Sequence, residues 1–238
     1  MKLIPVMDLK AGCVVRAVQG DRERYRPIVS GLCGGHEPVT VARALLDCSG
    51  ADVLYLADLD ALTGGERQAV VITTLLEALP DTRLWLDAAF RDRADWLALQ
   101  AMLGGAASRV QPVYASEALS SGAALTEAFD APASGILSLD TRGGEPLDAG
   151  GCWQRPDAWP GHVIVMTLDR VGSGGGPDLA TLARIRRRRP DVRVVGAGGI
   201  RDKADLTRAA ATGAWAWLVA SALHDRRIVA VGHGVSLF

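Results

Sequence analysis

The sequence of this 238-residue chain predicts an α/β fold, a closed (β/α)8 TIM barrel in which eight parallel strands are each followed by a helix. Three observations predict it. Short apolar runs alternate with helical patterns along the chain, these runs are almost continuously hydrophobic, and segments of the first half recur in the second. Continuous apolar strands are typical of a parallel sheet covered on both faces. The chain length suits one such barrel.

The predicted elements follow one another in strict alternation. We expect strands at Lys2–Met7, Asp52–Ala57, Arg83–Leu86, Arg109–Val113, Gly135–Leu139, His162–Met166, Val192–Val195 and Trp215–Val219. We expect helices at Pro38–Cys48, Glu66–Leu79, Arg91–Leu103, Glu117–Phe129, Asp178–Arg188 and Asp202–Thr212.

Three pairs of segments repeat in the same order in the two halves. Residues 87–96 match 197–206, Tyr55–Gly65 matches Ile164–Gly175, and Pro5–Gly12 matches Leu137–Gly144. We interpret this order as an internal duplication. One domain over residues 1–238 would then consist of two homologous half-barrels, at about 1–130 and 131–238.

Composition excludes several classes of partner. Hydrophobic residues make up 49% of the chain and charged residues 22%, as in globular proteins with one large core. A net charge of −1 gives no general attraction to nucleic acid or to anionic membranes, and we expect neither as a partner. The basic run at 184–189 is interpreted as the last turn of a helix.

No targeting segment, membrane span or metal site is predicted. The four cysteines have no metal-ligand or C-x-x-C spacing, and the opening MKLIPVMDLK has no signal-peptide pattern. Apolar runs stay below the roughly 18 residues that a membrane span needs. We therefore expect a cytoplasmic protein without metal or cofactor, whose protein partners the sequence leaves unknown.

Two carboxylates are the candidate catalytic residues. Asp8 and Asp140 follow the first and fifth strands, whose carboxyl ends should face each other across the mouth of the barrel. One carboxyl group that gives a proton and one that takes it suit acid–base catalysis. Alternatively, each aspartate caps a turn or pairs with a neighbouring arginine, Arg16 or Arg142.

Glycine-rich connections in the second half predict a phosphate site. Bare backbone N–H groups before a helix bind anions, and barrels often use the loops after strands seven and eight for this purpose. The alternative is that these glycines only form tight turns. The predicted phosphate-binding residues are Gly172, Ser173, Gly174, Gly198, Gly199, Ala220 and Ser221.

The matching loop of the first half lacks these features. Asp87-Ala88-Ala89 stands where the second half has Ala197-Gly198-Gly199. The alanine Cβ atoms restrict positive φ and close backbone approach, and the aspartate should repel phosphate. We expect one phosphate cradle to be kept and the opposite site to hold a cationic or hydroxyl-bearing group.

Further substrate contacts are predicted around the mouth. The first long loop, Val18–Pro27, is a candidate mobile lid, with Arg16 directed toward an anion and Arg22 and Arg24 preferred as solvated loop charges. Trp153 either stacks on a planar ring or packs in the core. The remaining candidate contacts are Asp87, Thr167 and Asp169.

Three motifs resemble the histidine-biosynthesis barrel family, which includes ProFAR isomerase and the cyclase subunit of imidazole glycerol phosphate synthase. They are IPVMDLKAGCVVRAVQGD (Ile4–Asp21), SLDTRGG (Ser138–Gly144) and GAGGIRD (Gly196–Asp202), and the resemblance spans the whole chain. It implies that Asp8 and Asp140 are a catalytic acid/base pair and that no cofactor is used. It also implies an Amadori rearrangement, an aldose-to-ketose shift, of a substrate with two phosphates.

The chain departs from the family pattern at four places. Asp87-Ala88-Ala89 replaces a triple glycine, and Val113-Tyr114 replaces a small pair after strand four. Val171-Gly172-Ser173 replaces D-G-T, and Met166 replaces a Thr or Ser on strand six, although Thr167 is adjacent. We therefore predict a divergent isomerase-like enzyme for a small sugar derivative with one phosphate, in a cofactor or one-carbon pathway.

Three alternatives stay open at this point. The chain can be an authentic ProFAR isomerase, a non-catalytic phosphate-binding barrel, or a cyclase with a glutaminase partner. The presence of both Asp8 and Asp140 argues against a non-catalytic barrel, which needs neither.

Overall fold

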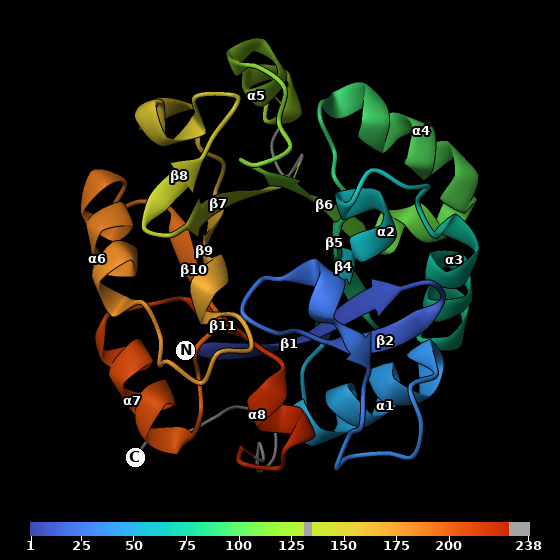
Figure 1. Ribbon diagram of the computed structural model, residues 1–238. Helices are drawn as coiled ribbons and strands as arrows, with labels where there is room; N and C mark the ends of the chain where they lie inside the picture. The colour runs from blue at the N-terminus through green and yellow to red at the C-terminus, as the bar shows by residue number, and fades with distance from the viewer. Residues whose placement is uncertain (131–134, 229–238) are drawn as a thin grey trace.

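A computed structural model describes residues 1–130 and 135–228 and confirms the closed barrel (Figure 1). Hydrogen bonds between the first and last parallel strands close the sheet. Within the described ranges eight strands form the barrel: β1 Lys2–Lys10, β4 Val53–Asp58, β5 Arg83–Asp87, β6 Val110–Ala115, β7 Ile136–Arg142, β9 His162–Thr167, β10 Arg193–Ala197 and β11 Ala216–Val219.

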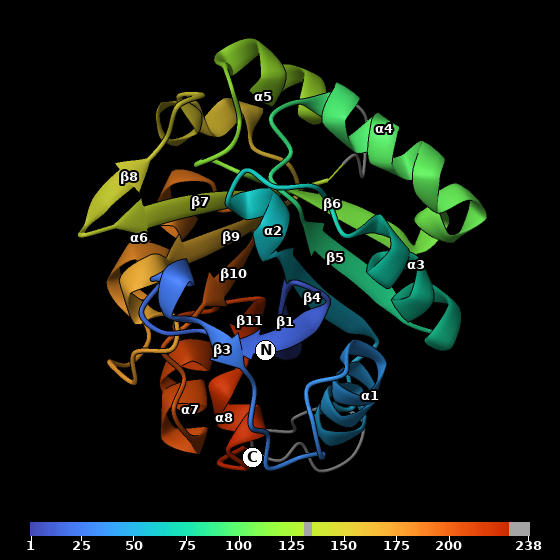
Figure 2. The same cartoon turned by 45° about the vertical axis from the view of Figure 1, so that its right-hand side comes forward.

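Helices surround this barrel (Figure 2). They are α1 Pro38–Ser49, α2 Leu59–Leu62, α3 Ala69–Ala78, α4 Arg93–Leu103, α5 Gly122–Ala128, α6 Leu179–Arg188, α7 Lys203–Ala211 and α8 Ser221–His224. Short 3-10 helices occur at η1 Arg22–Arg24, η2 Gly104–Arg109, η3 Cys152–Gln154, η4 Pro156–Ala158 and η5 Leu168–Arg170.

Local capping sets where several helices begin. The side chains of Asp92, Ser121, Asp178 and Asp202 each accept a hydrogen bond from a first-turn amide of the helix that follows. The prediction that the helix after strand four starts at Glu117 is therefore wrong: α5 starts at Gly122, directly after Ser121.

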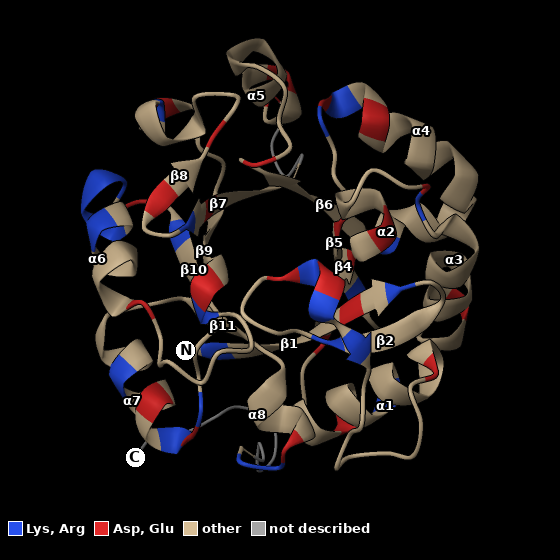
Figure 3. Cartoon of the chain, viewed as in Figure 1, with Lys and Arg blue, Asp and Glu red and all other residues tan. Residues whose placement is uncertain are grey.

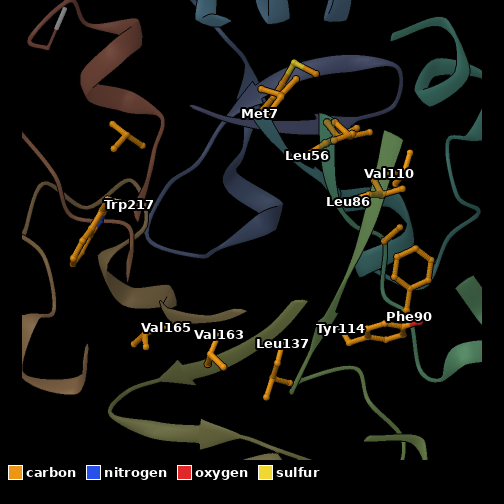
Figure 4. Close-up of a cluster of buried hydrophobic side chains, with 14 of the residues drawn as sticks. Met7, Leu56, Leu86, Phe90, Val110, Tyr114, Leu137, Val163, Val165 and Trp217 are labelled. Atoms are coloured by element: carbon orange, nitrogen blue, oxygen red, sulfur yellow. The ribbon is translucent and has the colours of Figure 1, made fainter. Parts of the chain in front are cut away.

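Strand residues alternate between two hydrophobic layers. One set of side chains, including Leu56, Leu86 and Trp217, packs between the strands and the helices (Figure 4). The other set, including Tyr55, Trp85 and Ile164, fills the inside of the barrel. Side chains two residues apart on a strand point to the same face of the sheet. The face that fills the inside of the barrel therefore also carries the last polar side chain of the strand, which lies at the mouth.

Three additional strands extend the loops at the mouth. β2 (Cys13–Arg16) pairs antiparallel with β1, β3 (Arg26–Pro27) pairs with β2, and β8 (Glu145–Leu147) pairs with β7. The segment predicted as a mobile loop, Val18–Pro27, thus contains η1 and β3 and buries Tyr25.

Sheet register makes the two halves equivalent at the mouth. Asp8 pairs with Ala57, and Ala57 pairs with Asp87. In the second half Asp140 pairs with Met166, and Met166 pairs with Ala197. The matched registers identify Ala197 as the positional counterpart of Asp87.

The basic run forms the end of α6, as predicted, and stands out in blue in Figure 3. Arg184 and Arg188 lie over the rings of Trp153 and Trp159, so part of the run packs on aromatic side chains. No helix of the described residues is long and apolar enough to cross a membrane.

Candidate active site

A cavity of about 300 Å³ opens at the carboxyl ends of the strands. This is the end of the fold at which barrel enzymes bind their substrates. The cavity brings together both predicted catalytic residues and all seven predicted phosphate-binding residues, and it also includes Arg16 and Asp87.

Asp8 and Asp140 stand on opposite sides of this cavity. In the closed sheet β1 and β7 are separated by three strands in either direction. Burial raises the pKa of Asp8 to about 7; the nearby Arg22 guanidinium lowers it and the Asp87 carboxyl raises it. A carboxyl group with this pKa can both give and take a proton near neutral pH.

Asp140 is held in place by its own hydrogen bonds. Its carboxylate accepts hydrogen bonds from Ser138 Oγ at 2.7 Å and from the Glu117 backbone N–H at 3.2 Å. Burial, followed by the Glu117 carboxylate, raises the pKa of Asp140 well above its ordinary value despite these donors. This upward shift of the pKa favours the protonated form of Asp140, which is the form that a general acid needs.

Glycine loops line the side of the cavity formed by the second half. Gly172, Gly174, Gly198 and Gly199 all have positive φ. A Cβ atom on Gly199 would lie 2.2 Å from the carbonyl oxygen of Gly176, so only glycine fits there. Backbone amides exposed by such loops form anion sites, and half-buried Ser221 adds a hydroxyl group to the same wall.

Arginines gather at this same end. Arg16, Arg170, Arg201 and Arg227 all line the cavity. Arg16 donates to Asp225 Oδ1 at 2.7 Å, and Arg201 donates to Asp205. The second-half end of the cavity therefore combines open amides with positive charge, which suits an anionic group.

The first-half end is built differently. Asp87 ends β5, is 6% exposed, and accepts a hydrogen bond from the Tyr55 hydroxyl group at 3.0 Å. Arg67 donates to the carbonyl oxygens of Ala88 and Ala89 at 2.9 and 3.4 Å. Ala89 nevertheless has a φ of 53°, so the expected restriction of positive φ by its Cβ atom does not prevent a left-handed backbone here.

Asp87 also titrates unusually. Burial and the Glu117 carboxylate raise its pKa to about 7, while Tyr55, Arg22 and the Ala89 amide lower it. Its Oδ1 atom is buried and has no hydrogen-bond partner among the described residues.

An ion pair crosses the mouth between the first loop and the end of β6. Arg22 donates to Glu117 and, at 3.3 Å, to the carbonyl oxygen of Leu62. The interpretation of Arg22 as a solvated loop charge is therefore wrong, whereas Arg24 is exposed as predicted. Arg22, Leu62 and Glu117 also border a neighbouring cavity of about 790 Å³, beside Arg67 and Ala88-Ala89.

The small pair after strand four is also corrected. Val113 and Tyr114 lie within β6, and Tyr114 is fully buried against Phe90. The residues that follow, Ala115-Ser116, match Ala220-Ser221 in type and position. The Ser116 hydroxyl group, however, donates to the carbonyl oxygen of Leu147 and accepts from the Asp140 N–H, so it turns away from the first-half loop.

Three predicted contacts lie outside the cavity. Thr167 donates to Asp178 at 2.9 Å, and Asp169 accepts from the Gly143 N–H at 2.7 Å. Trp153, a residue of η3, packs in the core, which is the second of the two placements that the sequence left open. The positions of these residues at or after strand ends suggested that they bind substrate, but their side chains form local hydrogen bonds or pack in the core.

Three cavity residues carry no recognisable signal in the sequence. Tyr55 and Tyr25 look like ordinary core aromatics, and Glu117 looks like the first residue of a helix. Only the closed sheet brings them next to Asp8 and Asp87, because the β1, β4, β5 and β6 ends meet at one mouth.

The closed (β/α)8 fold and the carboxyl groups at its mouth are typical of the (β/α)8-barrel enzymes. More specifically, the histidine biosynthesis protein family matches residues 2–229, and the chain belongs to that family. The predicted resemblance is thereby confirmed.

Individual relatives support the same assignment. The 1-(5-phosphoribosyl)-5-((5-phosphoribosylamino)methylideneamino)imidazole-4-carboxamide isomerase (ProFAR isomerase) of Paracoccus denitrificans is 30% identical over 96% of both chains. That of Thermus thermophilus is 32% identical over 96% of both. An uncharacterized protein of Methanocaldococcus jannaschii is 27% identical over 94% of this chain and 93% of its own. The predicted enzyme class, an isomerase, is confirmed.

Proposed function

We propose that this chain is an aldose–ketose isomerase for a sugar-derived substrate that carries one phosphate. The phosphate binds to the glycine loops of the second half, and Asp8 and Asp140 move protons on the sugar. The observation that carries this proposal is the asymmetry between Ala197, which leaves one strand end open, and Asp87, which puts a carboxyl group at the equivalent end.

The proposed proton transfers use the places of Asp8 and Asp140 in the cavity wall together with their raised pKa values. Asp140, whose pKa is raised well above the ordinary value, donates a proton to the ring oxygen as the bond between that oxygen and C1 breaks. With an amino substituent at C1 this leaves an iminium group. Asp8, with a pKa of about 7, then removes the proton from C2. Loss of the C2 hydroxyl proton and protonation of C1 complete the ketose, so protons balance.

An authentic ProFAR isomerase is the second candidate. The two relatives that carry this name share about a third of their residues with the chain. The neighbouring cavity beside Ala88-Ala89 also contains Arg67 and Arg91, to which a second phosphate could bind. Rescue of a histidine auxotroph that lacks this isomerase would favour the second candidate, and failure despite soluble expression would favour the first.

The pathway stays a prediction. A place in cofactor or one-carbon metabolism agrees with an isomerase of this family that handles a different phosphorylated metabolite, but no residue specifies it. A non-catalytic barrel is disfavoured, since it gives no reason for two opposed carboxyl groups with raised pKa values.

Two measurements test the proposal. Calorimetric titration with inorganic phosphate should show one site per chain, which Gly199→Asp weakens. Incubation with aldose phosphates and 1-amino-aldose phosphates in D2O should put deuterium on carbon in the wild type and not in Asp8→Asn. A chain that binds no phosphate, or that exchanges no carbon-bound hydrogen in any of these substrates, would contradict it.

A further inference from the structure

One oxygen atom in the cavity wall lacks a hydrogen-bond partner. Asp87 Oδ2 accepts from Tyr55, but Oδ1 is buried and unpaired among residues 1–130 and 135–228. A buried carboxylate oxygen without a donor is costly, so its place in a cavity wall calls for a donor from a bound molecule or ion. Asp87 lines the cavity with Asp8 and Asp140, and a bound molecule can reach it there.

The nearest cation does not supply this donor. Arg22 uses its guanidinium for Glu117 and for the carbonyl oxygen of Leu62. The other carboxyl groups at this end belong to Asp8 and Glu117, and Asp140 lies across the mouth at the end of β7. The first-half end therefore has three carboxyl groups, those of Asp8, Asp87 and Glu117, and one arginine that is already paired.

The opposite end has the reverse composition. Arg16, Arg170, Arg201 and Arg227 line it together with a single carboxylate, Asp225. The cavity is thus basic at the glycine loops and acidic at the end of β5. A ligand that matches both ends carries a negative charge at one end and hydrogen-bond donors, best with a positive charge, at the other.

We propose that Asp87 binds a protonated amine of the substrate, at the end opposite its phosphate. This inference rests on the proposed function and adds the chemical class of the substrate, an amino-bearing phosphate ester. A second phosphate at this position would meet Asp87 and Glu117. A divalent cation needs several converging oxygen ligands, and no group of three or more acidic, histidine or cysteine side chains in the described part of the chain could hold one.

The test uses matched alkyl phosphates with three different far ends. Calorimetry at pH 8 measures the binding of aminoalkyl, hydroxyalkyl and alkane bisphosphates over a series of chain lengths, with inorganic phosphate as reference. At this pH an alkyl amine is still protonated and Asp87, with a pKa of about 7, is a carboxylate. The proteins are wild type, Asp87→Asn, and Glu66→Gln, an exposed acid beside the neighbouring cavity.

At the best chain length the wild type should bind the aminoalkyl phosphate at least about tenfold more tightly than the hydroxyalkyl phosphate, as expected for a desolvated charge pair. Asp87→Asn should lose this preference yet bind inorganic phosphate as the wild type does, which also shows that the variant folds. Glu66→Gln should keep it.

Tighter binding of the bisphosphate, or equal binding of amine and alcohol at all lengths, would overturn the inference while the phosphate site stands. A preference that Asp87→Asn retains would overturn it as well. No binding of inorganic phosphate would instead overturn the proposed function, and the inference with it.

Discussion

The ends of β5 and β10 occupy equivalent positions in the two halves, yet they present opposite chemistry. Asp87-Ala88-Ala89 closes the first with a carboxyl group and with backbone carbonyls that accept from Arg67. At the second strand end, Ala197-Gly198-Gly199 has no side-chain carboxyl group, and backbone amides and arginines line the cavity. Both loops precede a helix capped by an aspartate, Asp92 or Asp202. In each, an arginine just before the helix pairs with an aspartate of its first turn.

The difference teaches that loop shape and ligand preference are separable. Ala89 keeps a left-handed backbone, although that conformation costs an alanine about 1 kcal/mol. The two loops therefore keep the same left-handed residue, Ala89 or Gly199, although the residues around them differ. If the proposed function holds, one strand-end carboxyl group reverses the sign of the charge that this position prefers.

The largest expected effect concerns Asp8 and Asp140, the aspartates that occupy equivalent positions in the two halves. Asp8→Asn and Asp140→Asn should each lower turnover by about 10²- to 10⁴-fold, the usual worth of a general acid or base. Phosphate affinity should stay close to that of the wild type, because neither residue lies on the glycine loops. Deuterium exchange and calorimetry on the same samples measure both quantities.

Asp169→Asn is the matched control for these variants. Asp169 is also an acid after a barrel strand, but its carboxylate accepts from the Gly143 amide outside the cavity. We expect it to exchange deuterium like the wild type. If the control loses as much activity as Asp8→Asn, the loss reflects damage to the mouth and not a missing acid or base.

The next effect strikes the second-half loop alone. Gly199→Ala places a Cβ atom 2.2 Å from the Gly176 carbonyl oxygen at a φ of 79°. The loop must shift, so phosphate affinity should fall by roughly tenfold or more and the free energy of unfolding by about 1–3 kcal/mol. Calorimetry and chemical denaturation measure these changes, and unchanged phosphate binding would place the anion elsewhere.

The sequence predicts this comparison better than it predicts the walls of the cavity. Strand alternation and the repeated motifs identify Asp8, Asp140 and both loops, because these features are local in the chain. Tyr55, Glu117 and the pairing of Arg22 are set by contacts between strands and loops far apart in sequence. Trp153 and Thr167 show the converse. Their positions after strands suggested site residues, but Trp153 packs in the core and Thr167 donates a hydrogen bond to Asp178.

A smaller effect is expected in the pH dependence of stability. Asp87 has a pKa of about 7 when folded and an ordinary value of 3.8, so the folded state binds its proton more strongly. Stability from this group is complete below about pH 4 and is lost as pH rises through 7. In Asp87→Asn this loss of stability is absent. The free energy of unfolding of the variant should therefore exceed that of the wild type by roughly 1–3 kcal/mol at pH 8 but not at pH 4.

Thermal or urea unfolding from pH 4 to 8 measures this difference. Asp8 titrates in the same range, so part of the loss should remain in Asp87→Asn and disappear only in the double variant with Asp8→Asn. Exposed Glu66→Gln should differ from the wild type by the same small amount at every pH. A pH profile of Asp87→Asn parallel to that of the wild type would mean that Asp87 is ionised without strain.

The smallest effect is expected from the reverse change in the first half. Ala89→Gly relieves the left-handed backbone at φ 53° and should raise the free energy of unfolding by up to about 1 kcal/mol. It should not create phosphate affinity, because Asp87 stays in place and Arg67 still binds the loop carbonyls. Urea unfolding and phosphate calorimetry measure the two outcomes. A second phosphate site in Ala89→Gly would show that the alanine Cβ, and not the Asp87 carboxyl group, sets the difference between the halves.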